Sequence, residues 1–147
     1  MTTEFYTLLS ALSAEFGPTG CECRVAALLE NELSGLCDCS RDRMGSLICH
    51  LPGKGEKLLL VAHMDEAGFM VTDIDDKGYL RIAPTGNADP ACFLGKHLTV
   101  GNETVLLKGI GGGKVLHLTS GAERTDSPSF DKLFIDLGFQ NKEEAEK

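Results

Sequence analysis

The residues best suited to chemistry are a histidine and an aspartate two positions apart, His63 and Asp65. They follow an apolar run, Leu58 to Ala62, which is typical of a strand buried on both faces. Ligands usually bind where such strands end in an open α/β sheet. A carboxylate near a metal-binding histidine commonly orients its imidazole. The pair therefore predicts a metal site, with His63 as ligand and Asp65 as its orienting carboxylate.

The cysteines offer a second kind of metal site. Two Cys-x-Cys pairs, Cys21/Cys23 and Cys37/Cys39, could together hold a structural Zn²⁺ through four thiolates. However, Cys-x₂-Cys is the commoner chelating pair, and a predicted helix separates these two. The alternative is that the cysteines are small buried side chains. Because no secretion signal is visible, disulfides are not expected.

Composition and charge limit the class of protein and its partners. A chain of 147 residues is long enough for one ordinary domain or two small ones. The formal net charge is −8 and no basic cluster occurs, which argues against nucleic acid or an anionic membrane as partner. No apolar run approaches the roughly 20 residues that span a bilayer, and the N-terminus lacks a signal-peptide pattern. We therefore expect a cytoplasmic protein.

Two amphipathic helices and a hairpin are predicted before the apolar run. They are expected at residues 3–16, 20–34, 36–42 and 45–51. The second helix begins at a capping-box pattern, Thr19 to Glu22. This order of elements indicates the opening of an α/β layer, whose buried strand delivers His63 and Asp65 to its edge.

After Gly68 the pattern changes to short apolar runs separated by turn residues. Strands are expected at residues 69–74, 79–83, 97–100, 104–108 and 133–137. Gly111 to Gly113 is interpreted as one of the turns, and Asn141 as the N-cap of a further helix. Such spacing predicts a small antiparallel barrel or sandwich. The predicted fold class is α/β plus β, with a partial α/β layer in residues 1–68 and a β-barrel-like domain in residues 69–147.

Three stretches, in order and spacing, make the chain resemble the N-terminal part of the tetrahedral aminopeptidases, family forty-two of the metallopeptidases. Members of this family are often labelled glutamyl aminopeptidase, deblocking aminopeptidase or endoglucanase. The stretches are Val61–Val71, Asp76–Arg81 leading to Asp89-Pro90, and Lys132–Gly138 followed by Asn141–Ala145. The resemblance covers essentially the whole chain.

This resemblance implies a catalytic α/β domain into which a β-barrel-like domain is inserted, the latter used for dimerisation and dodecamer assembly. His63 matches the family's first metal-binding histidine, and Asp65 matches the carboxylate that orients it. The family's enzymes are metallopeptidases that remove N-terminal residues from peptides. They use two divalent metal ions, Zn²⁺, Co²⁺ or Mn²⁺, to activate water and polarise the peptide carbonyl.

The resemblance also implies that further ligands are needed: a bridging aspartate, a glutamate as general base, other carboxylates and a second histidine. In the family these lie beyond the inserted domain. We therefore expect the chain alone to be inactive and its inserted domain to be incomplete. The other histidines, His50, His97 and His117, show no ligand pattern, and Glu66 is expected to be an exposed loop carboxylate rather than a general base.

An uncovered apolar strand predicts association. Leaving Leu58 to Val61 exposed would lose about 6–12 kcal/mol of hydrophobic stabilisation. We therefore expect a homo-oligomer, or a second chain that carries the missing catalytic half. Two alternatives to an aminopeptidase-like hydrolase are a non-catalytic oligomerisation module and a cysteine-ligated zinc module.

Overall fold

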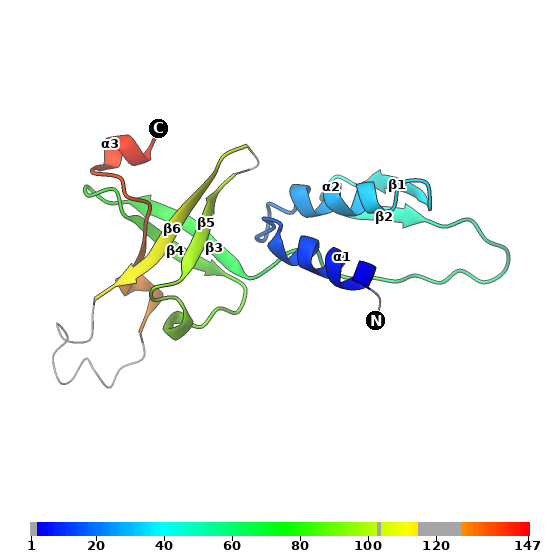
Figure 1. The fold of residues 1–147 in the computed structure, drawn as a ribbon, viewed down its shortest axis with the longest axis horizontal. Helices are drawn as coiled ribbons and strands as arrows, with labels where there is room; N and C mark the ends of the chain where they lie inside the picture. The colour runs from blue at the N-terminus through cyan, green and yellow to red at the C-terminus, as the bar shows by residue number, and fades with distance from the viewer. Residues whose placement is uncertain (1–2, 103, 115–127) are drawn as a thin grey trace. The chain divides into compact units, whose positions relative to one another are not determined.

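The computed structural model describes residues 3–102, 104–114 and 128–147. The chain divides into two compact units, Met1–Glu66 and Ala67–Lys147. Each unit combines helix with antiparallel strands (Figure 1). The mixture of helix and sheet that the sequence predicts is therefore confirmed.

The first unit contains two helices followed by a hairpin, in the predicted order. They are α1 (Thr3–Ala14), α2 (Cys23–Glu32), β1 (Asp38–Arg41) and β2 (Leu47–His50). The two strands pair antiparallel, with Cys39 opposite Cys49. Arg41 of β1 donates to the carboxylate of Glu30 in α2 at 2.7 Å, which links the hairpin to the helix.

The start of α2 differs from the predicted capping box. Glu22 is itself the N-cap residue, without a side-chain cap, and its carboxylate accepts from the Gly20 N–H at 2.7 Å. The Thr19 hydroxyl donates instead to the carboxylate of Asp65, which lies 46 positions along the chain. A hydroxyl side chain can hydrogen-bond to a local or to a distant acceptor, and a sequence pattern indicates only the local acceptors. Because Thr19 bonds to Asp65 and does not cap the helix, the capping-box prediction is wrong.

The buried strand expected at Leu58 to Ala62 does not form within the described residues. The connection between β2 and β3 carries no strand (Figure 1), and its nearest pairing is an isolated parallel bridge between Pro18 and Glu66. Leu58 to Val61 have side chains that are 83–85 % exposed. An apolar run records a preference for burial, whereas a strand also needs neighbours for its backbone groups. The prediction of burial on both faces is wrong for this chain taken by itself.

The second unit is a five-stranded antiparallel sheet with strand order β3-β4-β7-β6-β5. Its strands are β3 (Gly68–Ile74), β4 (Leu80–Thr85), β5 (His97–Gly101), β6 (Leu106–Gly113) and β7 (Leu133–Asp136). Two 3₁₀ turns, η1 (Pro90–Cys92) and η3 (Phe130–Lys132), accompany them. The sheet curls into a half-barrel. Its neighbouring strands all pair antiparallel, which confirms the predicted antiparallel character of this part.

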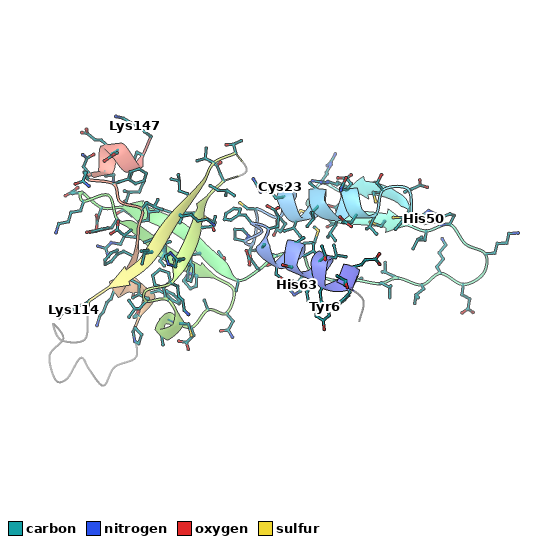
Figure 2. The ribbon with its side chains drawn as sticks, in the orientation of Figure 1. Tyr6, Cys23, His50, His63, Lys114 and Lys147 are labelled. Carbon is teal, nitrogen blue, oxygen red and sulfur yellow. The ribbon has the colours of Figure 1, made fainter. Side chains whose placement is uncertain are left out.

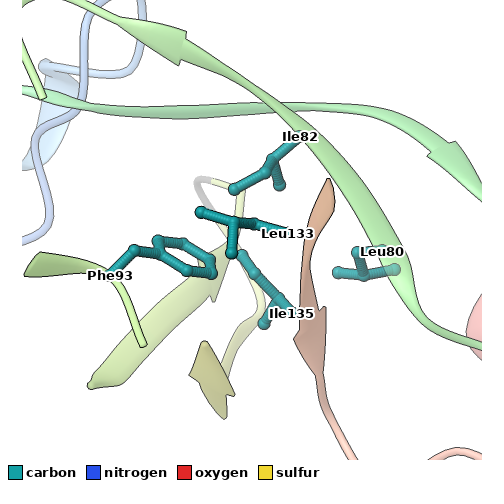
Figure 3. Close-up of a cluster of buried hydrophobic side chains, with 5 residues drawn as sticks. All are labelled: Leu80, Ile82, Phe93, Leu133 and Ile135. Atoms are coloured by element: carbon teal, nitrogen blue, oxygen red, sulfur yellow. The ribbon is translucent and has the colours of Figure 1, made fainter. Parts of the chain in front are cut away.

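Five buried apolar side chains form the core of the second unit (Figure 3). They are Leu80, Ile82, Phe93, Leu133 and Ile135, none more than 7 % exposed. Alternate residues of β4 and β7 supply four of them, as the period of two along a strand requires. The ring of Phe93, which follows η1, closes the cluster from the side (Figure 3).

The Gly111–Gly113 run lies in β6 and not in the predicted turn. A Cβ on Gly111 would lie less than 3.0 Å from the carbonyl oxygen and ring of Phe93, and one on Gly112 equally close to the ring of Phe134. Glycine in a strand often marks such a close approach. These glycines therefore let two aromatic rings pack directly on the strand backbone.

The last element is the short helix α3 (Lys142–Ala145). Asn141 is its N-cap, and the Asn141 side chain accepts from the N–H of Glu144 at 2.9 Å, as predicted. Among the helices of the described residues, none combines the length and apolar character required to cross a bilayer.

Candidate metal centre

His63 and Asp65 lie on an extended segment that is held against the residues preceding α2. The N–H of Glu66 donates to the carbonyl of Gly17 at 2.9 Å, next to the bridge between Pro18 and Glu66. Gly17 is buried, and a Cβ there would lie less than 3.0 Å from Val25 of α2. The absence of a side chain at Gly17 thus allows the segment, the loop and the helix to pack closely.

The carboxylate of Asp65 joins Thr19 to His63. Thr19 donates to Oδ2 at 2.7 Å, and Nδ1 of His63 lies 3.0 Å from Oδ1 and 2.9 Å from the main-chain oxygen of Asp65. Because both of these oxygens are acceptors, Nδ1 carries the imidazole proton. In the neutral imidazole with its proton on Nδ1, the lone pair lies on Nε2, and neutral imidazole is the form of histidine that binds a metal.

The same contacts set the charge of Asp65. The hydrogen bond from Thr19, and to a lesser extent His63, holds the pKa of the Asp65 carboxyl below its ordinary value, although partial burial opposes the shift. The carboxylate is therefore ionised at neutral pH. It accepts from Thr19 on one oxygen and from the imidazole on the other.

The imidazole of His63 is exposed, and few other donor groups of the described residues lie near it. The side chain of His63, which is labelled in Figure 2, is 84 % exposed, so that an ion can reach it from solvent. Within the described residues, no group of three or more metal-ligating side chains includes His63. A catalytic zinc normally takes three protein ligands. Among the described residues, His63 therefore has Asp65 beside it and no further metal-ligating group, so a zinc centre at His63 would need additional donors.

The other histidines lie apart from this arrangement. His50 on β2 and His97 on β5 are exposed and belong to no metal-ligating group among the described residues. His117 lies outside the described residues. The side chain of Glu66 is exposed, as expected for a loop carboxylate.

The cysteines group differently from the prediction. Cys37 and Cys39 come together with Cys49, and the group does not include Cys21 or Cys23. The four-cysteine zinc arrangement is therefore wrong. None of the six cysteines, all of which lie in described residues, is in a disulfide. The hairpin register, which puts Cys49 opposite Cys39, is the signal that would have identified the third thiol.

A hollow of about 540 Å³ lies in the second unit, where it is lined by charged and aromatic side chains. Within it, Arg81 donates to Asp75 at 2.8 Å and lies 5.8 Å from the ring centre of Phe134. These groups are engaged with one another and form no nucleophile and base pair. His63 is therefore a better candidate for a functional residue than the groups that line this hollow.

Sequence comparison finds relatives that are named aminopeptidases. Residues 45–147 match the family model described as M42 glutamyl aminopeptidase. The lysyl aminopeptidase of Pyrococcus furiosus is 33 % identical over 107 residues, which are 72 % of this chain and 31 % of that protein. The glutamyl aminopeptidase of Lactococcus lactis is 31 % identical over 109 residues, 71 % of this chain and 31 % of that protein.

Solved structures give the same result for the fold. A TET aminopeptidase from a marine sediment Thaumarchaeota archaeon has a TM-score of 0.86 and 29 % identity, covering 99 % of this chain and 41 % of that one. The TET1 peptidase of Pyrococcus horikoshii, which can assemble into a tetrahedron or a large octahedral shell, has a TM-score of 0.83 and 31 % identity, covering 95 % of this chain and 42 % of that one.

The match extends over most of this chain but over a smaller part of its relatives. Two curated relatives match 95 % and 98 % of this chain, and the chain spans only 40 % and 42 % of their lengths. One matched structure, from Thermotoga maritima, bears the label endoglucanase at a TM-score of 0.77 and 33 % identity, covering 94 % of this chain and 40 % of that one. Family model, relatives and structures agree with the three stretches recognised in the sequence: the chain belongs to the M42 glutamyl aminopeptidase family.

Proposed function

We propose that this chain forms one part of a metal-dependent aminopeptidase, which removes N-terminal residues from peptides, and that it is inactive by itself. The arrangement at His63 carries the proposal, because its Nδ1–H faces an ionised carboxylate and its Nε2 faces solvent. Membership of the M42 family supports the reaction class. When bound, two divalent ions of the Zn²⁺, Co²⁺ or Mn²⁺ type would activate a water and polarise the peptide carbonyl.

In this proposal His63, Asp65 and Thr19 form half of a metal site, the half-site, and each of them has its own role. His63 holds one ion through Nε2. Asp65 fixes the tautomer and orientation of the imidazole and raises its basicity, as carboxylates beside metal-bound histidines do. Thr19 is a positioning residue, since its 2.7 Å hydrogen bond holds the carboxylate in place. The remaining ligands and the general base come from polypeptide outside the described site.

The exposed apolar surface of the first unit is the surface that we propose contacts this additional polypeptide. Besides Leu58 to Val61, it includes Phe5 and Leu9 of α1, which are 47 % and 49 % exposed. Covering the four residues of the run would contribute about 6–12 kcal/mol. This is comparable with the entire stability of a typical domain, about 5–15 kcal/mol.

We assign the two parts of the chain different tasks. Residues 1–68 belong to the catalytic domain, and residues 69–147 to a domain that mediates dimerisation and higher assembly. The partner is a second copy of the chain or a polypeptide that carries the missing catalytic half. Support comes from a matched TET1 structure that is a dodecamer, with a TM-score of 0.84 and 32 % identity.

Peptidase assays on two proteins test the proposal. The purified chain should not hydrolyse aminoacyl-nitroanilides with Co²⁺, Mn²⁺ or Zn²⁺. A chimera in which it replaces the matching part of the Lactococcus lactis glutamyl aminopeptidase should do so. His63→Ala should abolish this activity, whereas His50→Ala, at an exposed histidine of β2, should preserve it. Turnover by the chain alone, or by a folded His63→Ala chimera, would refute the proposal.

A further inference from the structure

Three cysteine thiols meet at the hairpin of the first unit. Cys39 of β1 stands opposite Cys49 of β2, and their Sγ atoms are 3.5 Å apart. Cys37, just before β1, has its Sγ 3.7 Å from that of Cys39. All three sulfur atoms lie within 4.8 Å of one another. The hairpin thus brings three sulfur atoms, which are soft metal donors, to one place, although Cys49 lies on the other strand from Cys39.

These separations fit a single metal ion. With Zn–S bonds of about 2.3 Å and tetrahedral angles, two sulfur ligands of one Zn²⁺ lie about 3.8 Å apart. The observed distances of 3.5 and 3.7 Å are close to this value. The hairpin register places Cys39 opposite Cys49 without a metal, and the Arg41–Glu30 ion pair links β1 to α2.

The site lies beside the end of α2. The thiol of Cys37 lies 3.9 Å from the carbonyl oxygen of Leu33, the C-cap residue of α2, and this contact positions the sulfur atom. Cys37 and Cys39 are half-buried and Cys49 is exposed, so that an ion can enter from solvent.

We propose that Cys37, Cys39 and Cys49 bind a thiophilic divalent cation of the Zn²⁺ class. Each thiol releases its proton to solvent, so that Zn²⁺ and three Cys–SH groups give one Zn(S–Cys)₃⁻ unit and three H⁺. A water completes the tetrahedron. His63 takes no part in this site, which does not depend on the proposed aminopeptidase function.

Without a metal, Cys37 and Cys49 resist ionisation. The neighbouring Cys39, together with burial, raises the pKa of Cys49 to about 11, and burial, with Cys39, raises that of Cys37. Adjacent thiolates repel each other when no cation is present. A bound metal ion reverses this preference and deprotonates a coordinating thiol.

Metal titration of the reduced full chain tests the site, with Co²⁺ as a spectroscopic probe that Zn²⁺ displaces. One equivalent of Co²⁺ should bind and produce a sulfur-to-cobalt charge-transfer band. Zn²⁺ should protect Cys37, Cys39 and Cys49 from alkylation, as measured for each peptide by mass spectrometry. Cys92, an exposed cysteine of the second unit, should stay reactive.

Matched variants separate this site from other binding. Cys39→Ser should weaken Zn²⁺ binding by more than the roughly 100-fold that loss of an outer-shell partner can cost. Cys49→Ser, at an exposed position, should do the same if Cys39→Ser fails to fold. Cys92→Ser, in the second unit, should bind Zn²⁺ as the unaltered chain does.

Four results would overturn the site. The first is a folded chain that gives no charge-transfer band with Co²⁺, and the second is a folded Cys39→Ser or Cys49→Ser variant with unchanged Zn²⁺ affinity. The third is a Cys92→Ser variant whose Zn²⁺ affinity is weakened equally. The fourth is a Cys39–Cys49 disulfide that persists under reducing conditions in a chain that retains no metal. Protection of the three hairpin cysteines alone would support it.

Discussion

Replacing two leucines of the exposed apolar run should sharply weaken association of the chain. Leu59 and Leu60 are 83 % and 85 % exposed, and in the strand that the sequence predicts, neighbouring side chains project to opposite sides. If a partner covers both sides, each leucine contributes about 1.5–3 kcal/mol. The double variant Leu59→Ser/Leu60→Ser should therefore lose about 3–6 kcal/mol. At 1.4 kcal/mol per factor of ten, the dissociation constant should rise by about two to four powers of ten.

Sedimentation velocity over a concentration series, combined with binding of a hydrophobic dye, measures this effect. The unaltered chain should associate at concentrations where the double variant remains monomeric. Met44→Ser is the matched control, because Met44 is an apolar residue that is 88 % exposed but lies in the hairpin turn outside the run. Two results would contradict this prediction: an unaltered chain that is a monodisperse monomer and binds no dye, or a Met44→Ser variant with the same effect as the double variant.

Three further predictions concern packing and the half-site. Leu133→Ala, at a core position that is 2 % exposed, should lower the free energy of unfolding by about 2–5 kcal/mol in urea titrations; a loss below 1 kcal/mol would contradict the core assignment. Gly111→Ala should cost about 1–3 kcal/mol by overpacking in the same titrations, whereas Gly53→Ala, where a Cβ meets open space, should be neutral; equal effects would refute the close packing. Thr19→Val should raise the pKa of Asp65 toward its ordinary value in an NMR titration, because the hydroxyl donor is lost, and an unchanged pKa would show that the hydrogen bond is unimportant.

The elements whose stabilising contacts are local could be predicted from the sequence. The helices, the hairpin and the short strands follow from apolar periods of 3.6 and 2, which directly reflect side-chain direction. Asn141 was identified as an N-cap because its hydrogen bond closes within three residues. The closeness of Asp65 to His63 likewise follows from a spacing of two, and the role of His63 as a metal ligand stays a prediction.

Features that depend on distant parts of the chain could not be predicted. Thr19 matches a capping box locally, yet its hydroxyl is used by an acceptor 46 positions away. Gly111 resembles a turn residue, although its conformation is set by the ring of Phe93 packing on its backbone. Leu58 to Val61 have the composition of a buried strand, but composition does not show whether the covering surface belongs to the same unit.

The most direct test of the proposed half-site is metal-dependent hydrolysis of an aminoacyl-nitroanilide, measured for the purified chain alone and for the chimera that restores the remaining ligands. We predict no turnover by the chain alone with Zn²⁺, Co²⁺ or Mn²⁺. We predict turnover by the chimera, lost in His63→Ala and retained in His50→Ala. Hydrolysis by a single copy of this chain, with both ions held by its own side chains, would contradict the account.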